Sequence, residues 1–228
     1  MSHLTPVLRA PVDTAVVDVD GTLVDSVYAH VWAWREAFRR VGVDVPTWKV
    51  HRAIGMGGDR LVEAVTDATV ERGVGDDIRS QHSRLYEDLS AQLSPTPGAT
   101  DLLEALKKHG LVVVLASSGS RHDTDDAIAL LEAGHLVDGA ISGDDTDSSK
   151  PDTEPVQHAV DSVQGTHALV IGDSVWDMTS ARRAGHEAVG LLTGGVAACE
   201  LLESGAGGAY EDPAELAEAL DDLLAFRP

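Results

Sequence analysis

The chain alternates between short apolar runs and longer segments in which apolar residues recur every three or four positions. The short runs are almost continuously apolar, which is typical of strands buried on both faces of a parallel sheet. The three-to-four spacing predicts amphipathic helices. The predicted strands cover residues 14–18, 111–116, 139–142, 167–171 and 188–192. Strands and helices in alternation predict an α/β fold, a Rossmann-like parallel sheet with helices on both faces.

A long segment without a strand pattern interrupts this alternation directly after the first strand. It predicts four or five amphipathic helices, which begin near Val27 and Thr47 and include residues 61–72 and 76–91. We expect two tryptophans of this segment, Trp32 and Trp34, to pack between its helices. We expect four basic residues of this segment to lie on solvated helix faces: Arg72, Arg79, His82 and Arg84.

The same segment predicts a division into two domains. Prolines and a glycine in residues 94–98 mark the return to the sheet. We therefore expect an inserted α-helical cap domain over residues 25–94 and an α/β core made of residues 1–24 and 95–228. Two linkers of chain would let such a cap open and close over a site on the core.

Composition narrows the possible partners of this 228-residue chain. Its net charge of −21 argues against nucleic acids and anionic membranes, whose phosphates it would repel. No apolar run approaches the length of a membrane helix, and the N-terminus lacks a secretory pattern. Cys199 is the only cysteine, which fits a reducing compartment. We expect a cytoplasmic protein, either a monomer or a homodimer.

Two carboxylates emerge where the first predicted strand ends, in Asp18-Val19-Asp20-Gly21-Thr22-Leu23. Alternate side chains of a strand share a face, so Asp18 and Asp20 can face one site. Such a site is expected at the carboxyl ends of parallel strands, where α/β proteins bind ligands. Taken alone, however, this pair is a weak signal, because carboxylates also cap turns and bind stray cations.

Three further segments place polar groups at likely strand ends or beside them. They are Ser117 in Leu115-Ala116-Ser117-Ser118-Gly119, Lys150 in Ser149-Lys150-Pro151-Asp152, and the pair Asp173 and Asp177 in the segment from Ile171 to Asp177. In this order and spacing, the four segments resemble the motifs of the haloacid dehalogenase superfamily. The chain is similar to its phosphoglycolate phosphatase and β-phosphoglucomutase branch, which carries a helical cap.

The resemblance implies a role for each core residue. Asp18 would be the nucleophile that forms an aspartyl-phosphate, and Asp20 the general acid and base, with a pKa brought towards neutrality. Mg²⁺ would be held by Asp18, Asp173 and the main-chain carbonyl of Asp20. Lys150 would neutralise the transferring phosphoryl group, and Ser117 would donate its hydroxyl to it.

The roles of the predicted supporting and substrate-binding residues leave more alternatives open. Asp177 is expected to support the metal site or Lys150, and Ser174 either supports a ligand or caps a helix. The expected substrate-binding residues are Thr22, Ser118, Gly119, Arg52 and Arg60. Ser117 or Ser118 could instead only cap the next helix. The glycine-rich segment 54–60 could instead be a helix-helix turn, with the neighbouring arginines solvated.

These residues predict a Mg²⁺-dependent phosphatase of a small phosphorylated metabolite. The main alternative is a β-phosphoglucomutase-like mutase, which would share the whole core, and a non-catalytic binding protein on the same scaffold is a third. Asp20 disfavours a dehalogenase, because by the resemblance dehalogenases keep no carboxylate acid and base there. A phosphonatase would need an activated cap lysine, and nothing around Lys49 indicates one.

Overall fold

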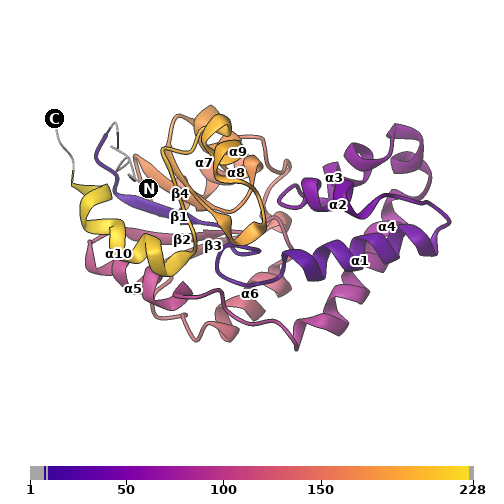
Figure 1. Ribbon diagram of the computed structural model, residues 1–228, viewed down its shortest axis with the longest axis horizontal. Coiled ribbons are helices and arrows are strands. Elements are labelled where there is room, and N and C mark those ends of the chain that lie inside the picture. The colour runs from indigo at the N-terminus through magenta and orange to yellow at the C-terminus, as the bar shows by residue number, and fades with distance from the viewer. Residues whose placement is uncertain (1–7, 9, 226–228) are drawn as a thin grey trace.

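A computed structural model describes residue 8 and residues 10–225 and contains a six-stranded, entirely parallel sheet (Figure 1). The strand order is β3-β2-β1-β4-β5-β6. The strands are β1 (Thr14–Val17), β2 (Val112–Ala116), β3 (Gly139–Ile141), β4 (Ala168–Gly172), β5 (Glu187–Leu191) and β6 (Gly208–Tyr210). The predicted α/β fold is confirmed.

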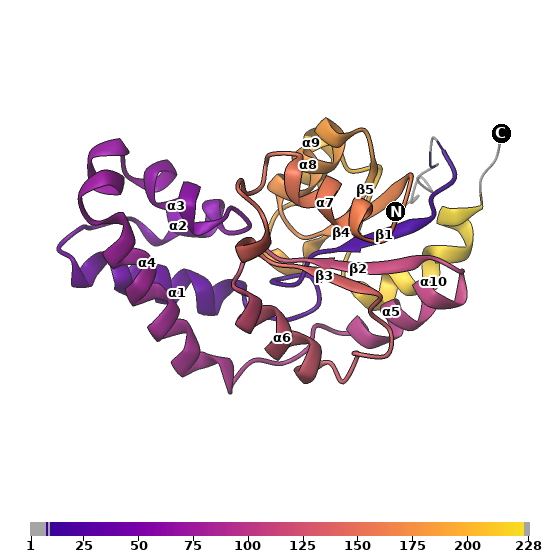
Figure 2. The ribbon, with the colours of Figure 1, turned by 180° about the vertical axis from the view of Figure 1, so that it is seen from behind.

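Helices cover both faces of the sheet, as the continuous apolar strands require. In β1, Ala15 and Val17 join the hydrophobic core under one face, whereas Val16 joins the core under the other. The first face carries α5 (Ala99–Lys108), α6 (Arg121–Leu130) and α10 (Pro213–Leu224). The second carries α7 (Glu154–Ser162), α8 (Val175–Ala184) and α9 (Ala198–Ser204), as Figure 2 shows from behind.

The direction of chain crossing reverses at β1. The chain passes from β1 to β2 and β3 on one side, then returns to β4, β5 and β6 on the other. The helices on either side of such a reversal diverge and leave a crevice at the carboxyl ends of the strands. The structure therefore offers a ligand site at the ends of β1, β2 and β4.

Four helices between β1 and β2 form a separate layer beside this edge of the sheet (Figure 1). They are α1 (Val27–Arg40), α2 (Thr47–Ala53), α3 (Gly58–Val65) and α4 (Ala68–Ser90). They have a hydrophobic core of their own, in which Phe38 and Ile78 are fully buried. We call these four helices the cap and the sheet with its helices the core. The two chain segments that join them are paired, because Asp25 N–H donates to the Ser94 carbonyl at 2.9 Å.

The break between the third and fourth cap helices differs from the prediction. It lies at Thr66 and Asp67, and α4 runs uninterrupted through both Gly73 and Gly75. Asp67 caps α4 by accepting from the N–H groups of Thr69 and Val70. Gly75 is buried against the Glu71 carboxylate, so a side chain at position 75 would displace that group. The glycine thus makes room for a side chain instead of ending the helix.

Other differences are small and local. The short edge strand β6 and helix α9 were not predicted from the sequence. Trp34 is buried as expected, but Trp32 is 49% exposed, so its predicted packing inside the cap is wrong. Two 3-10 turns cover Gly143–Asp145 and Leu192–Gly194. None of the described helices combines the length and the apolar character needed to cross a membrane.

We predict that Phe38→Ala lowers the free energy of unfolding by about 3 to 5 kcal/mol, because it leaves a cavity in the centre of the cap. Trp48→Ala is the matched control, since Trp48 is 66% exposed and its removal should change stability by less than about 0.5 kcal/mol. Urea unfolding followed by circular dichroism measures both. Equal effects of the two substitutions would contradict a separate cap core.

Candidate active site

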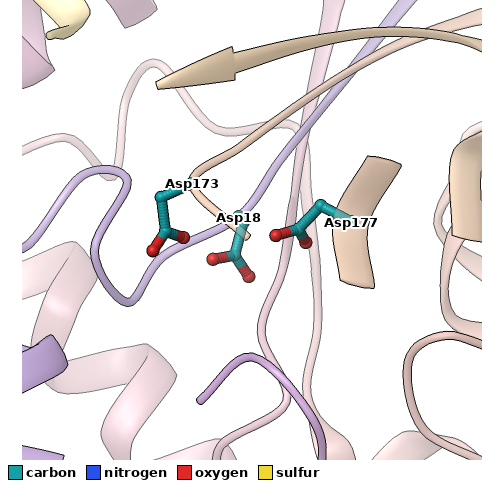
Figure 3. A group of neighbouring side chains, drawn as sticks. All are labelled: Asp18, Asp173 and Asp177. Carbon is teal, nitrogen blue, oxygen red and sulfur yellow. The ribbon is translucent and has the colours of Figure 1, made fainter. Parts of the chain in front are cut away.

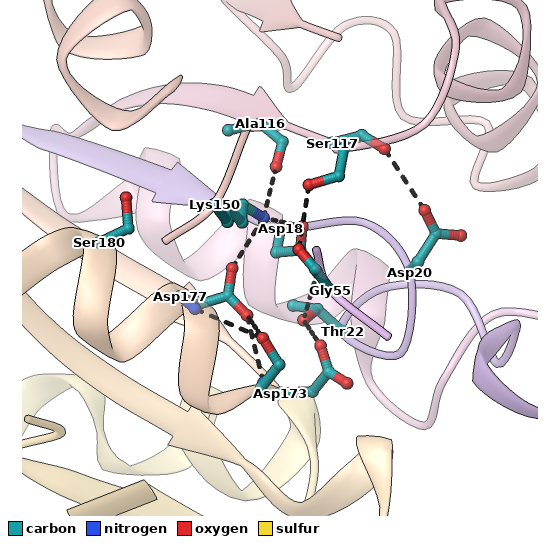
Figure 4. Close-up of polar contacts among 12 residues, drawn as sticks. Asp18, Asp20, Thr22, Gly55, Ala116, Ser117, Lys150, Asp173, Asp177 and Ser180 are labelled. Atoms are coloured by element: carbon teal, nitrogen blue, oxygen red, sulfur yellow. Dashed lines mark hydrogen bonds and ion pairs between the residues drawn. The ribbon is translucent and has the colours of Figure 1, made fainter. Parts of the chain in front are cut away.

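Four polar side chains meet at the predicted edge of the sheet (Figure 4). Asp18 follows β1, Ser117 follows β2 and Asp173 follows β4. Lys150 reaches the same place from the segment before α7. Because β1 lies between β2 and β4 in a parallel sheet, their carboxyl ends place these groups side by side.

Lys150 is the buried cation of this site. Its Nζ forms an ion pair with Asp18, lies 2.7 Å from Oδ1 of Asp177 and donates to the main-chain carbonyl of Ala116 at 3.0 Å. Burial lowers the pKa of Lys150, but the two carboxylates outweigh this effect and raise the pKa above its ordinary value. The lysine therefore carries a fixed positive charge at the end of the sheet.

Asp18, Asp173 and Asp177 form a buried cluster of carboxylates (Figure 3). Each offers an oxygen within 4.8 Å of the others. Burial raises the pKa of Asp18 to about 7, since Lys150 opposes this effect only in part. Burial and the charge of Asp18 hold the pKa of Asp173 well above its ordinary value. Three carboxylates and one lysine leave an excess of negative charge, and oxygen ligands of this kind suit a hard divalent cation.

Two neighbouring hydroxyls hold these carboxylates in place. Ser174 caps α8, and its Oγ donates to Oδ2 of Asp177 at 2.5 Å. Thr22 is fully buried, with its Oγ1 3.2 Å from Oδ1 of Asp173 and 3.4 Å from Oδ2 of Asp18. Ser174 and Asp177 thus lie where a supporting role was predicted. Thr22 was predicted to bind substrate, but it contacts carboxylates of the site.

Asp20 lies beside the cluster and has polar partners of its own. Its Oδ1 accepts from Ser26 at 2.6 Å and lies 3.0 Å from Nε2 of His30, and Ser117 donates to its Oδ2 at 3.3 Å. Burial raises the pKa of Asp20, but His30 and Ser26 together outweigh it and lower the pKa below its ordinary value. The predicted pKa near neutrality is therefore wrong for this state of the protein, in which Asp20 is ionised.

The segment between β2 and α6 closes the site on one side. The Gly119 N–H donates to Oγ of Ser117 at 2.9 Å, and Oγ of Ser118 donates to the Gly55 carbonyl of the cap at 3.1 Å. The N-cap of α6 is Ser120, which forms a capping box with Asp123. Neither Ser117 nor Ser118 caps α6, so the alternative in which one of them serves only as a helix cap is wrong.

A cavity of about 170 Å³ lies between the cap and the core at this site. Its core side is formed by Asp18, Asp20, Ser118, Gly119, Ser120 and Asp123. Its cap side comes mainly from α1, α3, α4 and the glycine-rich segment between α2 and α3. Of the five predicted substrate-binding residues, Ser118 and Gly119 line the cavity.

Arg52 and Arg60 do not line the cavity, although both were predicted to bind substrate. Arg52 forms an ion pair of 2.6 Å with Glu200 of α9, and Arg60 forms an ion pair with Asp152 of the core. His51 adds a third contact from the cap, 2.9 Å from the carbonyl of Gly194. These residues hold the cap against the core in this structure.

Aromatic and histidine residues on the cap side of the site were not predicted from the sequence. Nδ1 of His30 lies 3.1 Å from Nε2 of His82, and the ring of His82 stacks on Trp34 with centroids 3.9 Å apart. The ring of His30 stacks on Tyr86 at 3.8 Å. The solvated helix face predicted for His82 and Arg79 is wrong, since both line the cavity. Ser26, at the N-cap of α1, is followed by His30 and Trp34 at four-residue spacing, which places the three on one face of the helix. This spacing could have indicated from the sequence that they act together.

We predict that Asp173→Asn stabilises the metal-free protein, and increasingly so as the pH rises from about 4 to about 7. In this range the folded protein holds protons on Asp18 and Asp173 that the unfolded chain has released, so the stability of the wild type falls as the pH rises. The amide removes one of the conflicting charges. We expect a gain of about 1 to 3 kcal/mol at neutral pH.

Urea unfolding in EDTA over a pH series measures this gain. Asp88→Asn is the control, because it removes an exposed carboxylate outside the cluster. A gain that does not change with pH, or that equals the effect of Asp88→Asn, would contradict the mutual repulsion of the buried carboxylates.

Comparisons with known proteins agree with this geometry. The chain is 28% identical over 193 residues to validoxylamine A 7'-phosphate phosphatase of Streptomyces hygroscopicus, a match that covers 78% of this chain and 85% of that protein. It is 32% identical over 184 residues to the plasmid phosphoglycolate phosphatase of Cupriavidus necator, covering 77% and 78%. A hydrolase from Pseudomonas syringae has the same fold, with a TM-score of 0.86 and 35% identity over 92% of this chain and 98% of that one.

A family model matches residues 12–185, which include β1, the whole cap and every polar residue of the site described above up to Asp177. The predicted resemblance is thereby confirmed. The chain belongs to the haloacid dehalogenase-like hydrolases.

Proposed function

We propose that this hydrolase is a Mg²⁺-dependent phosphatase of a small phosphorylated metabolite, working through an aspartyl-phosphate. The observation that carries the proposal is the buried Asp18, which faces a cavity with Lys150 and two further carboxylates behind it. The names of relatives support the phosphatase reaction, because they include a phosphoglycolate phosphatase and a validoxylamine A 7'-phosphate phosphatase. They differ in the alcohol that leaves, so they do not identify the substrate.

The residues of the acidic cluster fit a magnesium ion. Asp18 and Asp173 supply oxygen atoms close enough to share one cation. Their pKa values are raised because burial and neighbouring carboxylates disfavour the ionised forms, which a bound cation would stabilise. We propose that Asp18, Asp173 and the main-chain carbonyl of Asp20 hold Mg²⁺. Asp177 is committed to Lys150 and Ser174, so we assign it a supporting role. When bound, the ion would neutralise charge on the phosphate and keep Asp18 ionised.

Asp18 is the proposed nucleophile. Its carboxylate would attack the phosphorus atom, form an acyl phosphate bond and release the alcohol. Lys150 and Ser117, with the N–H groups of Ser118 and Gly119, would hold the phosphoryl oxygens. A fixed cation and fixed donors in a dry site stabilise charge that develops on these oxygens, without the cost of reorganising water.

Asp20 is the proposed acid and base. It would protonate the leaving oxygen, then take a proton from the water that hydrolyses the intermediate. His30 and Ser26 hold it ionised in the ligand-free protein, which is the form required for the second step. For the first step it must bind a proton, and the approach of a phosphate dianion favours this because a like charge raises the pKa of a carboxyl group.

We propose that residues 25–94 act as a mobile cap on a core of residues 1–24 and 95–228. Polar side-chain contacts join the cap to the core, among them those of Arg52, Arg60 and His51. Such contacts can break and reform as substrate enters and leaves.

We also propose that the substrate is a free metabolite and that the enzyme works in the cytoplasm as a monomer or homodimer. The exposed free thiol of Cys199 supports a reducing compartment. The net charge of −21 supports a small ligand over a nucleic acid.

We predict that Asp18→Asn lowers kcat by at least about a thousandfold, because an amide is a poor nucleophile and a poor metal ligand. The test is phosphate release from a panel of phosphorylated metabolites and p-nitrophenyl phosphate, with Mg²⁺ or with EDTA. EDTA should abolish turnover. Phosphate that appears on a second sugar alcohol instead of in solution would favour the mutase, and no turnover of any compound by folded wild-type protein would contradict the proposal.

We predict that Arg52→Ala and Arg60→Ala each raise KM by about twofold to fivefold for every substrate, because each removes a partly exposed ion pair that holds the cap closed. Glu200→Gln and Asp152→Asn remove the partner charges and should have the same effect. Steady-state kinetics with p-nitrophenyl phosphate and with a phosphorylated carboxylic acid separates the alternatives. An increase confined to the substrate with the second anionic group would instead indicate that these arginines bind substrate.

A further inference from the structure

The cap side of the cavity is where the leaving group of a phosphate ester would lie, if Asp18 is the nucleophile as proposed above. Apolar and aromatic side chains form much of this wall, among them Trp34, Ile54, Met56 and Leu61. An empty space of about 150 Å³ holds a molecule the size of benzene. The cavity of about 170 Å³ must also hold the phosphoryl group, so a small leaving group fits within it.

The cavity offers no free cation on this side. Arg79 is the one Lys or Arg among its described lining residues. Its Nη2 and Nη1 bond to the two oxygens of the Glu71 carboxylate at 2.9 and 3.0 Å. Nη2 also pairs with Asp76 at 2.7 Å. Nη1 also donates to the Gly58 carbonyl at 3.1 Å. Both terminal nitrogens of Arg79 are thus already bonded to groups of the protein, and a substrate carboxylate would have to compete with Glu71 and Asp76 for them.

The two histidines of the cavity do not replace that charge. Both ring nitrogens of His30 are engaged, one with Asp20 and the other with His82. Burial, followed by the charge of His30, lowers the pKa of His82 well below its ordinary value, so the ring is neutral at pH 7. Nδ1 of His82 forms no hydrogen bond with the described residues. It is therefore a neutral group that can bond to a hydroxyl.

Asp123 adds a negative charge to the opposite wall. It lies on the first turn of α6, is half buried and lines the cavity. Its carboxylate accepts from the N–H and the hydroxyl of Ser120 at 3.2 and 2.7 Å, and within the part of the chain that the structure describes it forms no ion pair. A second anionic group on the substrate would meet this charge without a counter-ion.

We propose that the natural leaving group is an uncharged, hydroxyl-bearing alcohol, such as a small polyol or sugar, and not a hydroxy acid. Asp123 and His82 are the specificity-determining residues. Asp123 accepts a hydrogen bond from a hydroxyl and repels a carboxylate, and His82 bonds to a hydroxyl from the cap side. Burying an unpaired carboxylate beside like charges is costly, whereas a hydroxyl is satisfied by these partners.

A matched pair of substrates tests this proposal. 2-Hydroxyethyl phosphate and 2-phosphoglycolate differ in a CH₂OH group against a carboxylate, and glycerol 1-phosphate and 3-phosphoglycerate repeat the comparison with one carbon more. We expect kcat/KM in Mg²⁺ to favour the neutral member of each pair by at least about tenfold. Equal or faster turnover of the acids would overturn the proposal and leave the phosphatase standing. Absence of phosphate release from all four compounds and from p-nitrophenyl phosphate would overturn both.

Asp123→Asn tests the residue directly, because the amide keeps the shape and the bond to Ser120 but removes the charge. We expect it to shift the ratio of kcat/KM towards the acids by about fivefold to tenfold. Asp125→Asn is the control, since it removes an exposed charge from the same helix outside the cavity and should leave the ratio unchanged. Equal shifts in the two variants would overturn the role of Asp123, because they would indicate an effect of net charge alone.

Discussion

The site depends on one buried ammonium group in a strongly acidic protein. Lys150 joins Asp18, Asp177 and the end of β2 through a single nitrogen atom. Removing one partner of a buried ion pair typically costs about 3 to 5 kcal/mol, because the other charge is left uncompensated. Here two carboxylates would lose their counter-ion together. The lysine thus stabilises the fold at this edge of the sheet, and under the proposed function the same charge would hold the phosphoryl group.

The sheet explains why these charges gather in one place. Its central strands are apolar on both faces, so polar groups enter only where the strands end. The packing there leaves little room, since a side chain at Gly21 or Gly194 would collide with the Asp173 carboxylate. Gly21 also has φ of +78°, which other residues adopt at a cost. Close packing keeps water out, and this is why the pKa values of Asp18 and Asp173 are raised.

The core of the site could be predicted from the sequence because its signals are local. Asp18, Ser117 and Asp173 each follow an apolar run, and parallel strands bring such positions together whatever the loops between them do. The cap was harder, because its site residues are defined by how α1 packs on α4. His30 and His82 lie far apart in the sequence, and neither shows its partner in its own segment. The low pKa of Asp20 was missed for the same reason, since His30 lowers it from a helix of the cap.

The placement of cations in the cap has a consequence for how the enzyme selects its substrate. Arg52 and Arg60 are bound to acids of the core, and Arg79 is bound to acids of its own helix. In a chain with a net charge of −21, arginines are readily engaged by carboxylates of the protein itself. Arg52 and Arg60 thus serve to position the cap, and apart from the ion-paired Arg79 the cap residues that line the cavity are aromatic, apolar or polar without a fixed charge. Under the proposed function, attraction for the phosphate would then come from the core, and catalysis and selection would be divided between the two parts of the molecule.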